Sequence, residues 1–420
     1  MSIFFFRGIL GSKPQESLFA RVKRYKATPG HFSVLERLSM SRPSIPRGPK
    51  EITPEWFTTV FRENHVISSG EVMNVYPQVI GQDRGFTGVI VRVLLQYAGR
   101  KEEAEPSSVV VKLPTAIRDA PSAYRAAQQQ DVVAARHYFE RCTREVFFYE
   151  AVAPLSSLAV PRMYYGAADS GMGRVVLVLE DLPLARVGDA LYGCTPQEAP
   201  LVIDQLAYFH AQWWNHPQLE EFSWLPIWGG DSQVAQNRYV QIIDSFLQRF
   251  GQRVPKKVQG IIEALATDYG AVRTRLQQAP ATLVHGDLHL DNILFSPRDH
   301  QPGVTVIDWQ SVARGRSAID LALFLFGSLE TTTRRAVEAD LLKRYHELLV
   351  AGCVAGYGFS QLMEDCQLAL LWLLGATVVW LGSIDIDSLS ERELALVDAS
   401  LTEDSFTALL DYHAGSLLPL

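Results

Sequence analysis

The chain has 420 residues, of which 47% are hydrophobic and 20% charged, a composition typical of a globular protein and not of a disordered one. The net charge of −7 argues against a general nucleic-acid binder, because neutralising phosphates requires a basic surface. The four cysteines lie far apart, which excludes a zinc ribbon and a disulfide framework and suits a reducing compartment.

The first fifty residues are strongly basic. They contain ten Lys or Arg and two acids, a net charge of +8, so the other 370 residues carry −15. Because residues 40–50 (MSRPSIPRGPK) are rich in proline, serine and basic residues, we expect residues 1–50 to form an extension and linker outside the folded part. We therefore expect a cytoplasmic protein. The alternative is a mitochondrial or other organellar protein, with residues 1–50 as a transit peptide.

The folded part is predicted to begin with a short helix. Thr53 is a good N-cap and Pro54 suits the first turn of a helix that runs to about residue 62. Three runs with strand character follow, and their short polar links favour an antiparallel meander. A long helix and two more strands come next. The predicted strands are 75–80, 89–97, 108–113, 162–166 and 175–179, and the long helix is 122–153.

The pattern after Asp181 is mainly helical. The predicted helices are 200–214, 232–250, 258–277, 318–329, 331–351, 362–384 and 391–410, with one strand pair near 292–308. The uncharged run 368–384 is shorter than the roughly 20 residues that a spanning helix needs, so we expect a buried core helix and no membrane span. The sequence thus predicts a β-rich N-terminal lobe, residues 51–182, and a helical C-terminal lobe, residues 183–420.

The clearest chemical signal is the segment LVHGDLHLDNILF at 283–295. Two apolar runs flank its polar centre, and a second apolar run, VTVI at 304–307, leads into Asp308. Apolar strands that end in carboxylates and an amide present hard oxygen atoms, which Mg²⁺ prefers alongside phosphate oxygens. Asp287, Asn292 and Asp308 follow the order of a catalytic aspartate, a metal-binding asparagine and a metal-bridging aspartate in phosphoryl-transfer sites.

The motifs HGDLHLDN and IDWQ resemble the catalytic loop and metal-binding motif of the aminoglycoside phosphotransferase/choline kinase superfamily. Further matches, over residues 51–350, are similar to its ecdysteroid-kinase-like branch. They are ITPEWF at 52–57, VVVKLP at 109–114, REVFFYE at 144–150, LVLEDL at 177–182 and LAYFHAQWW at 206–214. The resemblance implies an α+β, two-lobed protein-kinase-like fold with a small antiparallel lobe and a large helical lobe. It also implies transfer of the γ-phosphoryl group of ATP, with Mg²⁺, to a hydroxyl of a small organic acceptor.

The resemblance assigns several residues to the nucleotide. Lys112 would contact the ATP phosphates and Glu145 would hold Lys112 by an ion pair. Glu180 and Leu182 would bound the hinge beside the adenine and contact it through backbone groups. The glycines between the first two strands, Gly81, Gly85 and Gly88, could cover the phosphates with backbone N–H groups.

It also assigns residues to the reaction itself. Asp287 would act as the general base, and Asn292 and Asp308 would be the Mg²⁺ ligands. His285 and Asp320, the latter in AIDLALF, would support the site structurally.

Two departures from the protein-kinase pattern favour a small-molecule acceptor over a protein. The usual protein-substrate segment A-P-E is absent, and Gln310 replaces the glycine that follows the metal-binding Asp-Phe of protein kinases. The glycine spacing G-x₃-G-x₂-G also differs from G-x-G-x-x-G, so the grip on phosphate there differs too.

Other functions stay open. One is a nucleotide-binding pseudokinase without turnover. Another is a binuclear metallohydrolase, because His285, Asp287, His289 and Asp291 alternate and would share one side of a strand. A cluster of tryptophans could line a pocket for an apolar acceptor, although core packing is favoured. Its members are Trp213, Trp214, Trp224 and Trp228.

Overall fold

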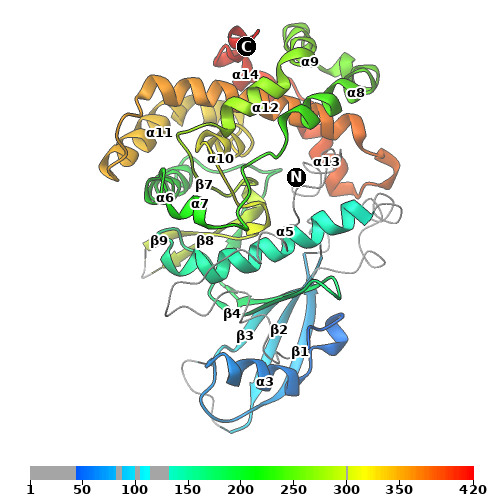
Figure 1. Cartoon of the computed structure of the whole chain (residues 1–420), viewed down its shortest axis with the longest axis vertical. Helices are drawn as coiled ribbons and strands as arrows, with labels where there is room; N and C mark the ends of the chain where they lie inside the picture. The colour runs from blue at the N-terminus through cyan, green and yellow to red at the C-terminus, as the bar shows by residue number, and fades with distance from the viewer. Residues whose placement is uncertain (1–43, 82–87, 100–104, 114–131, 299–300) are drawn as a thin grey trace. The chain divides into compact units, whose positions relative to one another are not determined.

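The computed structural model describes residues 44–81, 88–99, 105–113, 132–298 and 301–420 (Figure 1). The described residues fall into two units. The sheet unit contains the described residues up to Leu155, together with Val160–Leu184. The helical unit contains Ser156–Ala159 and Ala185–Leu420.

A five-stranded sheet forms the framework of the sheet unit. Its order is β1-β2-β3-β5-β4 and every neighbouring pair is antiparallel, so the predicted meander is confirmed. The strands are β1 (Val72–Ile80), β2 (Val89–Tyr97), β3 (Ser108–Leu113), β4 (Met163–Asp169) and β5 (Arg174–Glu180). Strand β1 begins three residues before the predicted start, because Val72 is buried in the core and pairs with Tyr97.

Two helices pack on this sheet. In α3 (Pro54–Glu63) the Thr53 hydroxyl accepts a hydrogen bond from the Trp56 N–H at 3.2 Å, as the N-cap prediction requires. Helix α3 packs on β1 and β4 and places its aromatic side chains among the valines of the strands. Helix α5 (Val132–Ala151) packs on β4 and β5. The first part of the predicted helix 122–153 lies outside the described residues.

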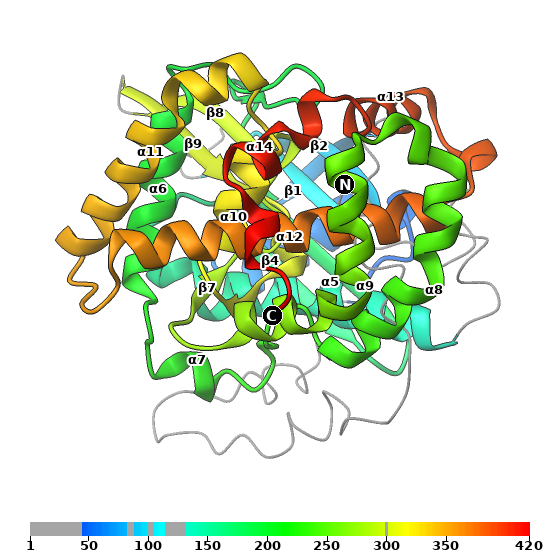
Figure 2. The ribbon, with the colours of Figure 1, turned by 90° about the horizontal axis from the view of Figure 1, so that it is seen from above.

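The helical unit is built around α12 (Phe359–Ser383). Helix α12 packs against α8, α9 and α10, and α6 packs against α11; Figure 2 shows α12 running across the middle of these helices. The other helices are α6 (Ala199–Gln212), α7 (Gln218–Glu221), α8 (Ser232–Phe250), α9 (Lys256–Gln277), α10 (Ala318–Leu321), α11 (Thr331–Ala351), α13 (Glu391–Ser400) and α14 (Thr407–Asp411).

Two predicted helices differ from the structure. The predicted helix 391–410 is two helices, α13 and α14, because the chain turns between them to bury both Leu401 and Phe406. The predicted helix 318–329 contains only the short α10, followed by a π-helical turn, Ala322–Phe326. Burial of side chains from almost all sides of this segment accounts for the irregular turn.

Helix α12 is the one helix in the described part of the chain that is long and apolar enough to cross a membrane. Of its most apolar 18-residue window, 72% is buried inside the protein, as in the core helix of a folded domain. The tryptophans nearby are also largely core residues. Trp213, Trp224 and Trp228 are buried, and the Trp228 and Trp372 rings contact edge to face at 4.7 Å. These three tryptophans are therefore core residues, the interpretation that the sequence favours, whereas Trp214 is half-buried.

Short strands in the helical unit carry the polar loops of the proposed site. Strands β8 (Ile293–Arg298) and β9 (Gln301–Val306) form an antiparallel pair, which confirms the pair predicted near 292–308. Strand β6 (Arg186–Val187) pairs with β8, while β7 (Thr282–Val284) pairs with β10 (Ala313–Gly315). The segment HGDLHLDN thus lies between β7 and β8.

Candidate active site

Asp320 of α10 holds the start of the loop that follows β7. The His285 N–H donates to Asp320 Oδ2 at 2.7 Å and the Gly286 N–H to Oδ1 at 2.9 Å. On the same carboxylate, Oδ2 lies 3.2 Å from His210 Nε2. Asp320 is completely buried, and a buried carboxylate needs such donors to offset its lost hydration. It therefore fixes the direction in which the chain leaves β7.

The His285 ring connects this loop to the segment before Asp308. Its Nε2 lies 2.9 Å from the carbonyl oxygen of Ile307, and the Asp287 N–H donates to Nδ1 at 3.3 Å. Since Nδ1 accepts from the Asp287 N–H, Nε2 is the nitrogen that donates to the Ile307 carbonyl oxygen. The Trp309 ring packs edge to face on His285 at 4.7 Å, so the imidazole is held by packing as well as by hydrogen bonds.

Asn292 lies against the backbone of Asp287. Its Nδ2 donates to the Asp287 carbonyl oxygen at 2.9 Å. This contact turns the amide so that Oδ1 is the atom available as a hard oxygen ligand. Both side chains are buried, in keeping with a site that excludes bulk water.

The β8–β9 hairpin brings Asn292 and Asp308 to neighbouring ends of two paired strands. Ile293 pairs with Val306, and the Ile307 N–H donates to the Asn292 carbonyl oxygen at 3.0 Å. The fifteen residues between the two proposed metal ligands are thus taken up by the hairpin and Ile307. The two side chains supply one amide oxygen and one carboxylate, a donor set that fits Mg²⁺ when phosphate oxygens complete the shell.

Asp308 has a left-handed backbone conformation, with φ 65° and ψ 62°. A non-glycine residue there stores about 1–3 kcal/mol of strain, and such strain clusters at functional sites. The side chain of Gln310 donates to Asp308 Oδ2 at 3.0 Å. Gln310, a departure from the protein-kinase pattern, therefore orients the carboxylate that we assign to the metal.

His289 is buried beside two carboxylates. Burial lowers the pKa of His289 to about 4, and the nearby Asp287 and Asp291 carboxylates oppose this only in part. The ring is neutral at pH 7. Its Nε2 lies 3.2 Å from Asn292 Nδ2 and 3.8 Å from Asp287 Oδ1.

The structure removes the strand geometry on which the metallohydrolase alternative depends. His285, Asp287, His289 and Asp291 lie on a loop that ends in a 3₁₀ turn, Leu290–Asn292, and not on a strand that would give them a common side. Across the described ranges, no group of three or more His, Cys, Asp or Glu side chains could hold a metal ion. A kinase-type magnesium site does not need such a group, because phosphate oxygens provide ligands.

In the sheet unit, Lys112 and Glu145 form the predicted ion pair. Lys112 Nζ on β3 lies 2.9 Å from Oε1 and 2.7 Å from Oε2 of Glu145 on α5. The Lys112 side chain is 20% exposed and that of Glu145 5%, so the pair is mostly shielded from water. The lysine thus has one fixed position at the end of β3.

The proposed hinge follows β5. The Glu180 N–H donates to the Arg162 carbonyl oxygen at 2.8 Å, so this backbone donor is already used within the protein. Asp181, next in the chain, accepts hydrogen bonds from Ser108 and Arg92. Leu182 is partly exposed.

Of the three glycines, Gly81 has a φ of 72° and Gly88 directly precedes β2, whereas Gly85 lies outside the described residues. The predicted cover over the phosphates stays a prediction.

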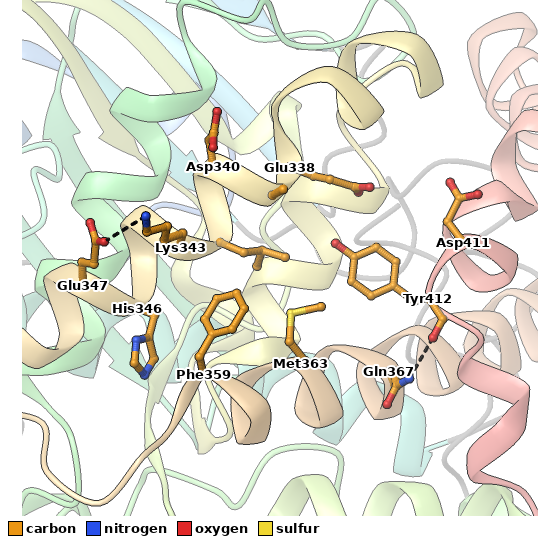
Figure 3. Close-up of a pocket in the computed structure, with 12 residues that line it drawn as sticks. Glu338, Asp340, Lys343, His346, Glu347, Phe359, Met363, Gln367, Asp411 and Tyr412 are labelled. Carbon is orange, nitrogen blue, oxygen red and sulfur yellow. Dashed lines mark hydrogen bonds and ion pairs between the residues drawn. The ribbon is translucent and has the colours of Figure 1, made fainter.

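A separate hollow of about 800 Å³ lies between α11, α12 and α14 (Figure 3). Phe359, Met363 and Tyr412 point toward its middle, and charged side chains surround them. None of the residues assigned to the reaction lines it.

The sequence interpretation missed Arg392, which contacts Asp291. Arg392 of α13 lies 2.8 Å from Asp291 Oδ1 and also binds Asp189. No motif marks Arg392, which is about a hundred positions from the loop, so only the folded chain reveals the contact.

These features define an α+β fold, with an antiparallel sheet in one unit and mainly helices in the other. A family model, the ecdysteroid kinase-like family, matches residues 82–355, and the chain belongs to this family. The match confirms the ecdysteroid-kinase-like branch that the motifs predict. No curated protein gives a significant match.

Several solved structures are similar to this chain at low sequence identity. An aminoglycoside phosphotransferase in complex with GDP and kanamycin is 13% identical, with a TM-score of 0.48, over 85% of this chain and 98% of that chain. The ethanolamine kinase of Plasmodium vivax is 13% identical, with a TM-score of 0.44, over 94% and 96%. An amicoumacin kinase in complex with AMP-PNP, Ca²⁺ and Ami is 12% identical, with a TM-score of 0.45, over 79% of this chain and 88% of that chain.

Proposed function

We propose that this protein is a small-molecule kinase that transfers the γ-phosphoryl group of ATP to a hydroxyl of an organic acceptor. In this reaction the acceptor oxygen forms a bond to the γ-phosphorus, the bond from that phosphorus to the bridging oxygen breaks, and ADP leaves. The Asp287 carboxylate takes the proton of the hydroxyl, or orients it for attack. Mg²⁺, when bound by Asn292 and Asp308, would neutralise phosphate charge.

The chain's own residues position the reactants. Asp320 and His285 fix the loop that carries Asp287, and Gln310 orients the Asp308 carboxylate. Lys112, held by Glu145, would place a positive charge on the phosphates. Positioning and charge neutralisation provide most of the catalysis in phosphoryl transfer, so this rigid arrangement suits the reaction.

The strongest support for this proposal is the arrangement of Asn292 and Asp308. The β8–β9 hairpin places an asparagine amide and a strained aspartate at adjacent strand ends, and the asparagine is hydrogen-bonded to the backbone of the proposed base. A turn asparagine and a strand-end aspartate with no chemical role would not require this burial or the left-handed backbone at Asp308.

The test is thermal unfolding of the wild type and of Asp308→Ala, with and without millimolar Mg²⁺–ATP and Mg²⁺–GTP. A ligand at about 100 times its dissociation constant adds roughly 2.7 kcal/mol to the free energy of unfolding, which raises the midpoint by a few degrees. We expect this rise in the wild type and its loss in Asp308→Ala. No rise with either nucleotide would contradict the proposal.

A positive result leads to a screen of hydroxylated small molecules by ADP release. Turnover with one of them supports the kinase. Nucleotide binding without turnover across the screen would favour the pseudokinase alternative.

A further inference from the structure

Arg392 binds two carboxylates from distant parts of the helical unit. It is the second residue of α13, a helix capped by Ser390. Its Nη1 and Nη2 donate to Oδ2 and Oδ1 of Asp189 at 3.1 and 2.9 Å, and Nη2 also donates to Asp291 Oδ1 at 2.8 Å. The planar guanidinium matches this geometry, which a lysine ammonium cannot reproduce in full.

Two successive contacts connect Asp291 to the proposed active site, the first with His289 and the second from His289 to the site residues. Asp291 Oδ2 lies 3.8 Å from His289 Nδ1. On the other side of the ring, His289 Nε2 lies 3.2 Å from Asn292 Nδ2 and 3.8 Å from Asp287 Oδ1. A continuous row of buried side chains thus joins Arg392 to the proposed metal ligand and the proposed base.

The Asp189 side of the bridge holds a second segment against the same loop. The Gly188 N–H donates to the Ile293 carbonyl oxygen at 2.8 Å, and a Cβ at Gly188 would collide with the Leu290 carbonyl oxygen. Asp189 Oδ1 also accepts from the Leu191 N–H at 2.9 Å, which fixes the turn. Gly188 therefore packs directly on the loop, and Arg392 ties both the loop and the turn that begins at Asp189 to α13.

Charge and burial explain why the contact matters. The Asp291 side chain is 6% exposed and that of Arg392 17%, so both groups have lost most of their hydration. A buried carboxylate needs a cation or several donors, and removing its cation favours a rearrangement toward water. Asp291 directly precedes Asn292, so a rearrangement of Asp291 displaces the proposed metal ligand.

We propose that Arg392 is a positioning residue for phosphoryl transfer. It acts through Asp291 and does not touch the nucleotide or the acceptor, and docking of α13 sets the geometry of the loop 285–292. This inference deepens the proposed function and rests on it for the role of Asn292.

The experiment uses the full chain with the variants Arg392→Ala and Arg392→Lys. Arg253→Ala is the matched control, because Arg253 Nη1 binds Asp398 Oδ1 at 2.8 Å on the same helix α13 without contacting the loop. Asp291→Asn, which preserves side-chain shape, replaces Arg392→Ala if the latter does not fold.

The first measurement is hydrogen exchange of backbone amides. We expect Arg392→Ala to speed exchange at least about tenfold in residues 286–293 and 188–193, with little change elsewhere, and Arg253→Ala to leave both segments unchanged. Unchanged exchange in the two segments, or equal acceleration throughout the chain, would overturn the proposal.

The second measurement is ADP affinity in EDTA and in Mg²⁺. We expect Arg392→Ala to reduce the gain in affinity from Mg²⁺ about tenfold, to leave the affinity in EDTA unchanged, and Arg392→Lys to recover part of the loss. A purely structural role would not separate the two affinities, so an unchanged Mg²⁺ gain overturns the proposal.

The two hypotheses fail differently. If the wild type binds no ADP, the proposed function fails and the exchange measurement alone decides whether Arg392 positions the loop. If the wild type binds Mg²⁺–ADP and the Arg392 variants match it in both measurements, the inference fails and the proposed function stands.

Discussion

The loop 285–292 of the helical unit and the Lys112–Glu145 pair of the sheet unit hold charged groups in different ways. In the loop, Asp320, His285 and Asn292 each bind backbone groups of the same short segment. In the sheet unit, one ion pair joins a strand to a helix. Several independent contacts therefore hold the first part of the loop, whereas the position of the Lys112 side chain depends on where α5 places Glu145.

Because of this difference, substitutions in the two regions should affect stability and activity to different extents. A substitution in the network around the loop leaves buried donors without acceptors, so it should lower both stability and activity. A substitution in the ion pair changes one contact, mostly shielded from water, that does not brace the loop, so it should act mainly on nucleotide binding. The predictions below test this distinction, beginning with the largest expected effect.

Asp287→Asn should separate chemistry from folding most sharply. Loss of the base should slow turnover by about 10²–10⁴-fold, the usual contribution of general acid–base catalysis. The midpoint of thermal unfolding should not fall, because the substitution preserves the shape of a side chain that lies 3.8 Å from His289 Nε2, beyond hydrogen-bonding distance. The measurement is ADP release with an acceptor found by screening. Undiminished turnover would remove Asp287 from this role.

Asp320→Ala should instead unfold the protein more easily. It removes the acceptor of two backbone N–H groups and the partner of His210, which should cost about 3–5 kcal/mol. Denaturant unfolding measures the loss. Asp204→Ala is the control, because Asp204 forms an ion pair with the half-exposed Arg344 and should cost under about 1 kcal/mol. Equal losses would show that Asp320 does not brace the loop.

Glu145→Gln should weaken the grip on nucleotide with little effect on stability. A hydrogen bond to a charged group contributes about 1.5–3 kcal/mol, so Mg²⁺–ATP affinity or turnover should fall by roughly 10- to 100-fold. Titration calorimetry and ADP release measure the two quantities. Glu140→Gln on the same helix should have no such effect, because Glu140 forms ion pairs with Arg136 and His137, which also lie on α5. Matching losses in the two variants would contradict an active role for the pair.

Gln310→Ala should have the smallest effect. It removes the hydrogen bond that orients Asp308, and a single such contact is worth about 1 kcal/mol, or several-fold in affinity. The Mg²⁺ concentration that half-saturates nucleotide binding should rise by that factor. Gln367→Ala is the matched control. It removes one hydrogen bond, to the Tyr412 carbonyl oxygen in the separate hollow, and should leave the Mg²⁺ dependence unchanged. An unchanged value for Gln310→Ala would mean that Asp308 needs no orienting partner.

The sequence by itself determined the α+β class and most helices and strands, because hydrophobic periodicity and capping are local properties. The N-cap at Thr53 and the meander of β1, β2 and β3 follow from neighbouring residues. The predicted helix boundaries were wrong where burial of side chains ends a helix, as at the turn between α13 and α14. The family motifs also named the residues of the candidate site, but not their geometry.

Only the tertiary structure decided how those residues are held. The contact of Gln310 with Asp308 depends on a left-handed residue that no local propensity predicts, and the contact of Arg392 with Asp291 joins positions 101 residues apart. Side-chain contacts over such separations depend on how helices pack, and packing is a property of the whole core and not of any window of sequence. The sequence therefore specified the chemical groups, and the fold specified which of them act together.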